Sequence, residues 1–300
     1  MSRLISIALV ILLSGCNKGS GTEEKPLPEF LHETRVTITG YNGDAMEPFI
    51  TKDDRYLFFN NLEGAGNKDI FYAEKVNDTV FAFIGEVQGV NTSFVDANPT
   101  MDRENRFYFI STRDLANSNR TIYSGHFSNG IVTGLHQVEG SINIPAPWWI
   151  NMGVEISGDG ELMFVSHAKF SAGAGFPEEG NIRFAVKEGD RYNIPDNEGT
   201  VLANINNDES IQYAGELSAD KKELFFSEVT LSDPPLFRLF YAVRKDTTGI
   251  FGDPVPVLEP FRENAHAVVE APTLSADGRR LYYHKKDARG IYAIYMLTRQ

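Results

Sequence analysis

Residues 272–284, with the sequence PTLSADGRRLYYH, decide the fold because their pattern occurs five times along the chain. In each copy an apolar residue precedes a polar turn, and an aromatic-rich segment follows the turn. Two of the turns contain Asp-Gly, at 159–160 and 277–278, which is a strong signal for a β-hairpin. The other four copies align with this one without gaps and are PFITKDDRYLFFN from Pro48, PTMDRENRFYFIS from Pro99, VEISGDGELMFVS from Val154 and GELSADKKELFFS from Gly215.

Two more strands are expected after each hairpin. The third strand begins near Asp69, Thr121, Asn181, Arg238 and Gly290. The fourth, outer strand follows, for example at 83–87, 132–138 and 251–257. Four antiparallel strands form one propeller blade, and the blade pattern recurs every 51 to 61 residues. We therefore predict an all-β domain over residues 31–300, a five-bladed β-propeller of four-stranded antiparallel blades.

The last repeat lacks an outer strand of its own, since its third strand continues to Gln300. Residues 36–38, Val-Thr-Ile, end 10 residues before Pro48, and the outer strands of other blades precede the next repeat at a similar spacing. We therefore expect this N-terminal strand to complete the last blade. Closure of this kind would leave no open sheet edge.

The repeat has a recognisable motif, in which Pro or a small residue is followed by Ser-Ala-Asp-Gly and by an aromatic strand that ends in Ser. This motif resembles the WD40-like repeats of the TolB C-terminal domain and of similar periplasmic propellers. The resemblance covers about residues 45–300 and implies a periplasmic propeller. TolB also has an N-terminal domain and a sixth blade. This sequence has neither, so the resemblance implies the fold rather than the role of TolB in the Tol-Pal system.

Residues 1–15 resemble a bacterial signal peptide. Arg3 supplies a positive charge, and the apolar run from Leu4 to Leu13 is too short to span a membrane. The run ends in Leu13-Ser14-Gly15-Cys16, which resembles the lipobox of bacterial lipoproteins. This resemblance implies cleavage before Cys16 and acylation of its sulfur. The alternative is an ordinary secretory signal with an unrelated cysteine.

Residues 16–30 are polar and rich in Gly, Pro and Glu, which is typical of a flexible tether. Asn17 follows the cysteine, and the sorting rule of enterobacterial lipoproteins then implies the outer membrane. We therefore expect a protein at the periplasmic side of the outer membrane, with the lipid as its only membrane contact. Cys16 is the only cysteine, so the mature chain has no internal disulfide.

Charge and motif content exclude several classes of function. A formal net charge of −13 repels phosphate backbones, so no nucleic-acid partner is expected. The sequence contains no G-x-S-x-G, no H-E-x-x-H, no phosphate-binding G-x-x-x-x-G-K and no paired-cysteine zinc motif, so no catalytic residue, metal or cofactor is predicted. Calcium at the repeated Asp159 and Asp277 is an alternative, although Asp at these positions is typical of a β-turn.

The innermost strands of the blades supply the first candidate site residues. Alternate side chains of a strand face opposite sides, and one parity here is apolar, as in Met46, Pro48 and Ile50. The other parity is polar, and we expect it to face the central funnel. Its members are Glu47, Asp96, Asn98, Asn151, Glu155, Gln212 and Glu216.

The loops at one end of the predicted ring supply three more candidates. In such a blade, the loop that enters the first strand lies at the same end as the loop between the second and third strands. Trp148 and Trp149 therefore share an end with the long segment 167–181, which begins at His167. The two tryptophans either bind a ligand or seal the gap between two blades.

Two functions from different classes fit these features. The anchor, the repeats and the lack of a catalytic motif favour a non-catalytic module that offers this end of the ring to an envelope protein or peptide. The alternative is a glycan-binding or glycan-cleaving propeller whose acid and base groups would be Glu47, Asp96, Glu155 and Glu216. Carboxylates open to an oligosaccharide would favour the enzyme, whereas carboxylates tied to neighbouring backbone amides would favour the scaffold.

Overall fold

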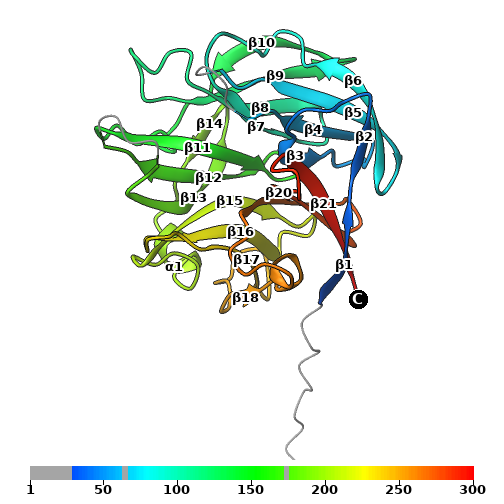
Figure 1. Ribbon diagram of the computed structural model, residues 1–300. Coiled ribbons are helices and arrows are strands. Elements are labelled where there is room, and N and C mark those ends of the chain that lie inside the picture. Colours follow the sequence, from blue (N-terminus) through cyan, green and yellow to red (C-terminus); the bar gives the residue numbers. More distant parts are fainter. Residues whose placement is uncertain (1–28, 63–66, 172–175) are drawn as a thin grey trace, which may run out of the picture.

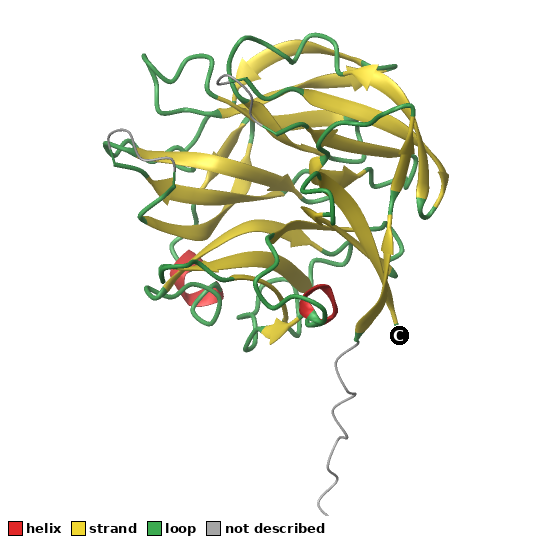
Figure 2. Ribbon diagram, in the orientation of Figure 1, coloured by secondary structure: helices red, strands yellow, loops and turns green. Residues whose placement is uncertain are grey.

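The structure is a computed structural model that describes residues 29–62, 67–171 and 176–300. The predicted signal peptide, Cys16 and the tether as far as residue 28 lie outside the described residues. Within them, regular structure is almost entirely β, apart from the short helix α1 (Glu198–Val201) and the 3-10 turn η1 (Glu259–Phe261), as Figure 2 shows. No described helix has both the length and the apolar character needed to cross a membrane.

Five four-stranded antiparallel blades surround a common axis, which confirms the predicted five-bladed propeller (Figure 1). Blade 1 contains β3 (Met46–Ile50), β4 (Tyr56–Asn60), β5 (Ile70–Asn77) and β6 (Val80–Glu86). Blade 2 contains β7 (Asp96–Met101), β8 (Arg106–Ser111), β9 (Ile122–Ser128) and β10 (Ile131–Gln137). Blade 3 contains β11 (Trp149–Ile156), β12 (Leu162–Lys169), β13 (Glu179–Glu188) and β14 (Arg191–Asn193). Blade 4 contains β15 (Ser210–Leu217), β16 (Glu223–Thr230), β17 (Phe237–Val243) and β18 (Val255–Pro256). Blade 5 contains β19 (Val269–Leu274), β20 (Arg280–Lys286), β21 (Tyr292–Arg299) and β1 (Phe30–Arg35).

The N-terminal strand closes the ring, although a different segment does so than the sequence predicted. β1 pairs with β21 as the outer strand of blade 5 (Figure 1). Residues 36–38 instead lead into β2 (Thr37–Thr39), which runs parallel to β6 as a fifth strand of blade 1. Phe30, expected at the end of the tether, begins β1 and packs edge-on against Phe225 with ring centroids 5.4 Å apart. Burial of the Phe30 ring therefore fixes the start of β1, the strand that closes the ring, against blade 4.

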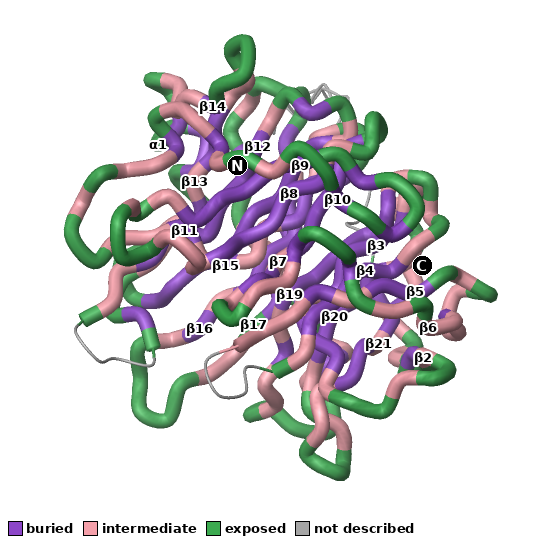
Figure 3. The backbone as a smooth tube through the Cα atoms, turned by 90° about the horizontal axis from the view of Figure 1, so that it is seen from above, coloured by how far each residue is buried: buried purple, intermediate pink, exposed green. Residues whose placement is uncertain are grey.

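The core lies between neighbouring blades, where the aromatic residues of the second strands meet the adjacent sheet. Phe58 of β4, for example, packs against Phe107 of β8 with ring centroids 5.2 Å apart. Buried apolar clusters of this kind join each blade to the next around the ring. In Figure 3 the central strands are accordingly buried and the loops exposed. Each buried aromatic or aliphatic side chain contributes about 1.5–3 kcal/mol, so packing between blades stabilises the ring.

The two ends of the propeller differ, and we call them the mouth and the base. The mouth carries the loops that enter the innermost strands, and the base carries the hairpin turns with the repeated aspartates. There Asp159 Oδ1 accepts from the amide of Glu161 (3.2 Å), which is the local turn hydrogen bond expected of this residue. Gln300 also lies at the base, because Thr298 pairs with Arg280, which directly follows the hairpin turn of blade 5. The amide of Gln300 donates to the carbonyl oxygen of Glu29 (2.9 Å), so the first described residues lie at the same end.

Candidate functional site

Every innermost strand contains a β-bulge, and the bulges determine which side chains face the central channel. The pairing between the first and second strands shifts at equivalent positions in blades 1, 2, 4 and 5, and about one residue earlier in blade 3. The bulge residue has a positive φ of 50° at Glu47, 52° at Asn98, 50° at Ala214 and 54° at Ala271, although none of these is glycine, which adopts such angles without strain. In blade 3 the equivalent residue is Gly153, which is not among the residues of positive φ. The extra residue reverses the alternation of side chains along the strand.

At four of the five junctions, the last residue of a repeat accepts a hydrogen bond from the bulge amide of the next blade. These bonds have donor–acceptor distances between 2.8 and 3.3 Å and run from Ala214 to Ser166, from Ala271 to Ser227, from Asn98 to Asn60 and from Glu47 to His284. A bulge leaves its amide without a ladder partner, and a buried amide needs one. The residue that ends the aromatic segment of the motif therefore connects neighbouring blades.

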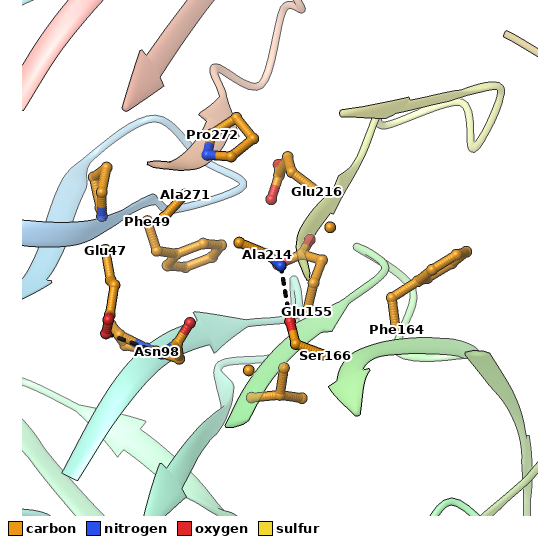
Figure 4. Close-up of a pocket in the computed structure, with 15 residues that line it drawn as sticks. Glu47, Phe49, Asn98, Glu155, Phe164, Ser166, Ala214, Glu216, Ala271 and Pro272 are labelled. Carbon is orange, nitrogen blue, oxygen red and sulfur yellow. Dashed lines mark hydrogen bonds between the residues drawn. The ribbon is translucent and has the colours of Figure 1, made fainter. Parts of the chain in front are cut away.

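The bulges divide the seven predicted funnel residues into two groups. The residues at or beyond the bulge line the channel as predicted, and they are Glu47, Asn98, Glu155 and Glu216 (Figure 4). The prediction is wrong for the residues before the bulge, because the reversed alternation turns them away from the channel. These are Asp96, Asn151 and Gln212.

The three misassigned side chains instead support the loops of the mouth. Asp96 forms an ion pair with Arg113 at 2.7 Å. Asn151 Nδ2 donates to the carbonyl oxygen of Ile142 (3.1 Å), which belongs to the loop before β11. Gln212 Nε2 donates to Ser210 Oγ at 2.8 Å. All three are fully buried, so they are structural groups rather than candidates for ligand contact.

A buried ion cluster closes the channel towards the base. Lys52 Nζ, from the hairpin of blade 1, lies 2.8 Å from Glu155 Oε1 and 3.4 Å from Glu216 Oε1. Burial and the charge of Glu155 raise the pKa of Glu216 to about 8, although Lys52 opposes this shift. The amide of Leu274 also donates to Glu216 Oε1 (3.3 Å). The cavity beside the cluster is about 40 Å³, well below the roughly 300–1,000 Å³ typical of ligand sites.

The channel widens at the other end into a cavity of about 250 Å³, which we call the mouth pocket. One of its acidic groups is Glu47. Lys68 Nζ donates to Glu47 Oε1 (2.7 Å), and Asn98 Nδ2 donates to Glu47 Oε2 (2.9 Å; Figure 4). Both carboxylate oxygens are thus engaged. An apolar part of the wall consists of Ile150, Met152 and Phe170.

Glu270 is the second acidic group of the mouth pocket, and sequence analysis missed it. Tyr213 Oη donates to Glu270 Oε1 (2.6 Å), and His284 Nε2 lies 3.5 Å from Glu270 Oε2. Burial raises the pKa of Glu270, but His284 and Tyr213 outweigh this effect and lower it overall. Strict alternation placed Glu270 and Tyr213 on the apolar parity, and only the bulge brings them to the channel. One sequence signal could have identified Glu270. At the equivalent position of the repeat, blades 1 to 3 have the apolar residues Met46, Ala97 and Met152.

Trp148 and Trp149 lie at the mouth as predicted, but their environments differ. Trp148 is 58% exposed. The ring of Trp149 stacks on His167, with centroids 4.8 Å apart and planes at 15°. His167 in turn is buried and hydrogen-bonds through Nδ1 to Asn151 Oδ1 (3.0 Å). Packing therefore explains Trp149 and His167, whereas Trp148 offers its ring to solvent.

The predicted long loop at 167–181 is shorter in the structure. β12 continues to Lys169 and β13 begins at Glu179, so His167 pairs with Asn181 inside the sheet. Some of the large exposed apolar side chains of the described residues lie in the mouth loops, and we call these the apolar rim; others, such as Val76 and Ile131, lie away from the mouth. The apolar rim consists of Leu62, Phe94, Leu115, Trp148, Phe176, Leu231 and Leu258.

The part of the chain that the structure describes contains no group of three or more His, Cys, Asp or Glu side chains arranged to hold a metal ion. The search of family models found no match to the sequence, and neither did the search of curated proteins. The chain does resemble solved structures in its fold.

Three solved structures illustrate this likeness. A glycoside hydrolase superimposes with a TM-score of 0.59 at 10% identity and covers 91% of each chain. An arabinanase from Bacillus subtilis has a TM-score of 0.53 at 12% identity over 85% of this chain and 94% of its own. TolB from Acinetobacter baumannii has a TM-score of 0.47 at 15% identity over 86% of this chain, which spans 55% of that protein. At these identities the likeness to the glycoside hydrolase and the arabinanase shows the fold alone.

Proposed function

We propose that this protein is a non-catalytic binding module that receives an envelope protein or a peptide at its mouth. The observation that carries the proposal is that the apolar rim and the mouth pocket occupy the same end of the propeller. Exposed apolar side chains grouped around a polar recess are typical of interaction sites, and aromatic residues contribute strongly there. Trp148, the most exposed aromatic ring of the rim, is the residue expected to contribute most.

The state of the carboxylates supports binding rather than hydrolysis. A glycosidase needs one carboxyl group that donates a proton to the substrate and a second with a free oxygen. The pKa of Glu216, raised to about 8, would suit an acid, but Glu155 and Glu216 are tied to Lys52 beside a cavity of about 40 Å³, which has no room for a sugar ring. In the mouth pocket, both oxygens of Glu47 accept hydrogen bonds, and the lowered pKa of Glu270 does not suit an acid.

Location follows from the N-terminal sequence. We propose that Cys16 is acylated and that the lipid holds the propeller at the periplasmic side of the outer membrane. The support is the positive residue, the apolar run and the Leu-Ser-Gly-Cys string in direct succession. A partner would then be another component of the cell envelope.

Selection of phage-displayed random peptides on the purified protein tests the binding proposal. We expect specific peptides to be enriched, and we expect Trp148→Ser to abolish their binding. Ile250→Ser is the matched control, because Ile250 is 51% exposed, close to the 58% of Trp148, but lies between β17 and β18, away from the mouth. Failure to enrich any peptide, or equal loss in both variants, would contradict the proposal.

Glycan binding or cleavage is the second candidate, and one observation favours it. Glu47 and Glu270 both line a pocket that opens at the mouth, and proteins of similar fold include a glycoside hydrolase and an arabinanase. Incubation with arabinan and other oligosaccharides, followed by measurement of released reducing ends, separates the two candidates. Release that disappears in both Glu47→Gln and Glu270→Gln would establish the enzyme and displace our proposal.

A further inference from the structure

The carboxylates that face the channel outnumber its cations. In the described part of the chain, two lysines reach the carboxylates that line the channel, and both already form ion pairs with glutamates. Lys52 bridges the pair at the base, and Lys68 lies 2.7 Å from Glu47. Glu270 forms no ion pair with a described lysine or arginine and relies on Tyr213 and His284. The charge of Glu270 is therefore not matched by a direct ion pair with a lysine or arginine of the described residues, and Lys68 acts on it only from a distance.

His284 provides a second, independent sign that the mouth pocket is built for a ligand. Its Nδ1 accepts the amide of Glu47, so the proton of the neutral ring is on Nε2. His284 is buried and lines the pocket, and its Nε2 lies 3.5 Å from Glu270 Oε2, yet this nitrogen makes no hydrogen bond of good geometry with any of the residues described. A buried donor without an acceptor is unfavourable. A ligand that brings an acceptor to this nitrogen would remove that penalty.

We propose that the mouth pocket binds the lysine or arginine side chain of a partner peptide, with Glu270 as the main acceptor of its charge. This inference rests on the proposed binding function and specifies the chemistry of the partner. The cationic head would lie between Glu270 and Glu47, and a carbonyl group of the peptide would accept from His284 Nε2. The apolar wall at Met152 and Phe170 suits the methylene groups of such a side chain.

Two further features favour a basic peptide with apolar neighbours. The net charge of −13 attracts positively charged segments over a distance and accelerates their encounter. The apolar rim lies at the same end of the propeller as the pocket, so apolar residues on either side of the cationic residue would find partners there, with Trp148 and Phe94 among them. Charge complementarity and rim contacts thus select the same kind of segment.

The test compares two synthetic peptides that differ only in a central lysine or norleucine, each flanked by leucines. Isothermal titration with the purified full-length protein should show the lysine peptide binding about tenfold tighter or more. In the Glu270→Gln variant, the affinity for the lysine peptide should fall to the affinity for the norleucine peptide. Glu161→Gln removes the same charge at the base and should change neither affinity.

A second variant, which should bind the peptide more tightly, distinguishes loss of the binding site from loss of folding. Lys68→Met removes a cation that competes for the same carboxylates, so the lysine peptide should bind several-fold tighter. A folding defect would weaken binding and cannot produce this result. Equal binding of the two peptides, or a phage selection whose peptides are not enriched in lysine or arginine, overturns the inference but leaves the proposed function in place. A selection that yields no peptide at all overturns both.

Discussion

The amide of Glu47 donates a hydrogen bond of 3.1 Å to Nδ1 of His284, a residue 237 positions later in the chain. This bond joins blade 1 to blade 5, the only neighbours in the ring that are not consecutive in sequence. Serine or asparagine makes the equivalent contact at three of the other junctions. His284 therefore combines a structural role in ring closure with a place on the wall of the mouth pocket.

Replacement of His284 tests the closure contact. His284→Leu leaves the buried amide of Glu47 without an acceptor, and we expect the free energy of unfolding to fall by about 1–3 kcal/mol. His284→Asn should lose less, because Asn60 of blade 1 accepts the corresponding amide, that of Asn98 in blade 2. Urea unfolding of both variants measures the difference. Equal losses would mean that the acceptor contributes nothing to closure.

Removal of β1 tests ring closure as a whole. A chain that begins at residue 36 loses the outer strand of blade 5 and the ring of Phe30, and it exposes the edge of β21. We expect the melting temperature to fall by roughly 10 °C or more, since several kcal/mol are lost. A chain that begins at residue 29 is the control and should melt like the full-length protein. Identical melting of both truncations would refute the closure.

Replacement by alanine should affect stability differently at the two tryptophans, Trp148 and Trp149. Trp148→Ala removes an exposed ring, so the free energy of unfolding should change by less than about 0.5 kcal/mol while peptide binding weakens. Trp149→Ala removes the ring that stacks on His167, and we expect a loss of about 1–3 kcal/mol. Thermal melting and peptide titration of both variants provide the comparison. A large stability loss in Trp148→Ala would remove it from the binding surface.

His167 should make stability depend on pH. Burial, assisted by the charge of Arg183, lowers its pKa from 6.5 to about 4. Between these values the unfolded chain takes up the proton more readily, so stability is fully present above pH 6.5 and declines as the pH falls to 4. The contribution is at most about 3 kcal/mol. Urea unfolding at several pH values should show a weaker decline in His167→Gln, and an unchanged profile would contradict the assignment.

Cys16→Ser tests the membrane anchor. We expect the variant to remain unprocessed or to appear in the soluble fraction, because the sulfur that would carry the lipid is missing. Fractionation of cells followed by mass spectrometry of the N-terminus measures both. Unchanged processing and membrane retention would show that Cys16 is not acylated.

The repeat pattern was sufficient to predict the blades, because hairpins with Asp-Gly turns and aromatic strands are local features. The bulges were not visible, because Glu47 and Ala271 adopt positive φ without being glycine. Tertiary hydrogen bonds from the previous blade stabilise that conformation, and no local pattern encodes them. A single unpredicted bulge residue in a strand reverses which side chains face the channel. For this reason the sequence predicted Asp96 at the channel and missed Glu270.

The closing strand shows a similar limit. Val36 to Ile38 have stronger β propensity than the stretch from Phe30 to Arg35, which contains His32, Glu33 and Arg35. What places β1 beside β21 is the burial of Phe30 against blade 4, together with the ion pair between Glu33 and Lys285 at 2.5 Å. Both contacts join residues more than a hundred positions apart. Contacts between residues so far apart in the chain form only in the folded ring, so a local sequence pattern does not predict them.

The position of Phe30 at the base has a consequence for how the propeller would meet its partners. A lipid on Cys16 would pull on the end of the ring opposite to the mouth pocket, so the mouth would point away from the bilayer. Thirteen residues from 17 to 29 can span at most about 45 Å, so an acylated Cys16 would confine the propeller to a thin layer beneath the membrane. Within that layer, the frequency of encounters would depend on the surface density of the partner and not on its bulk concentration. A partner that reaches across from the opposite membrane would meet the mouth first.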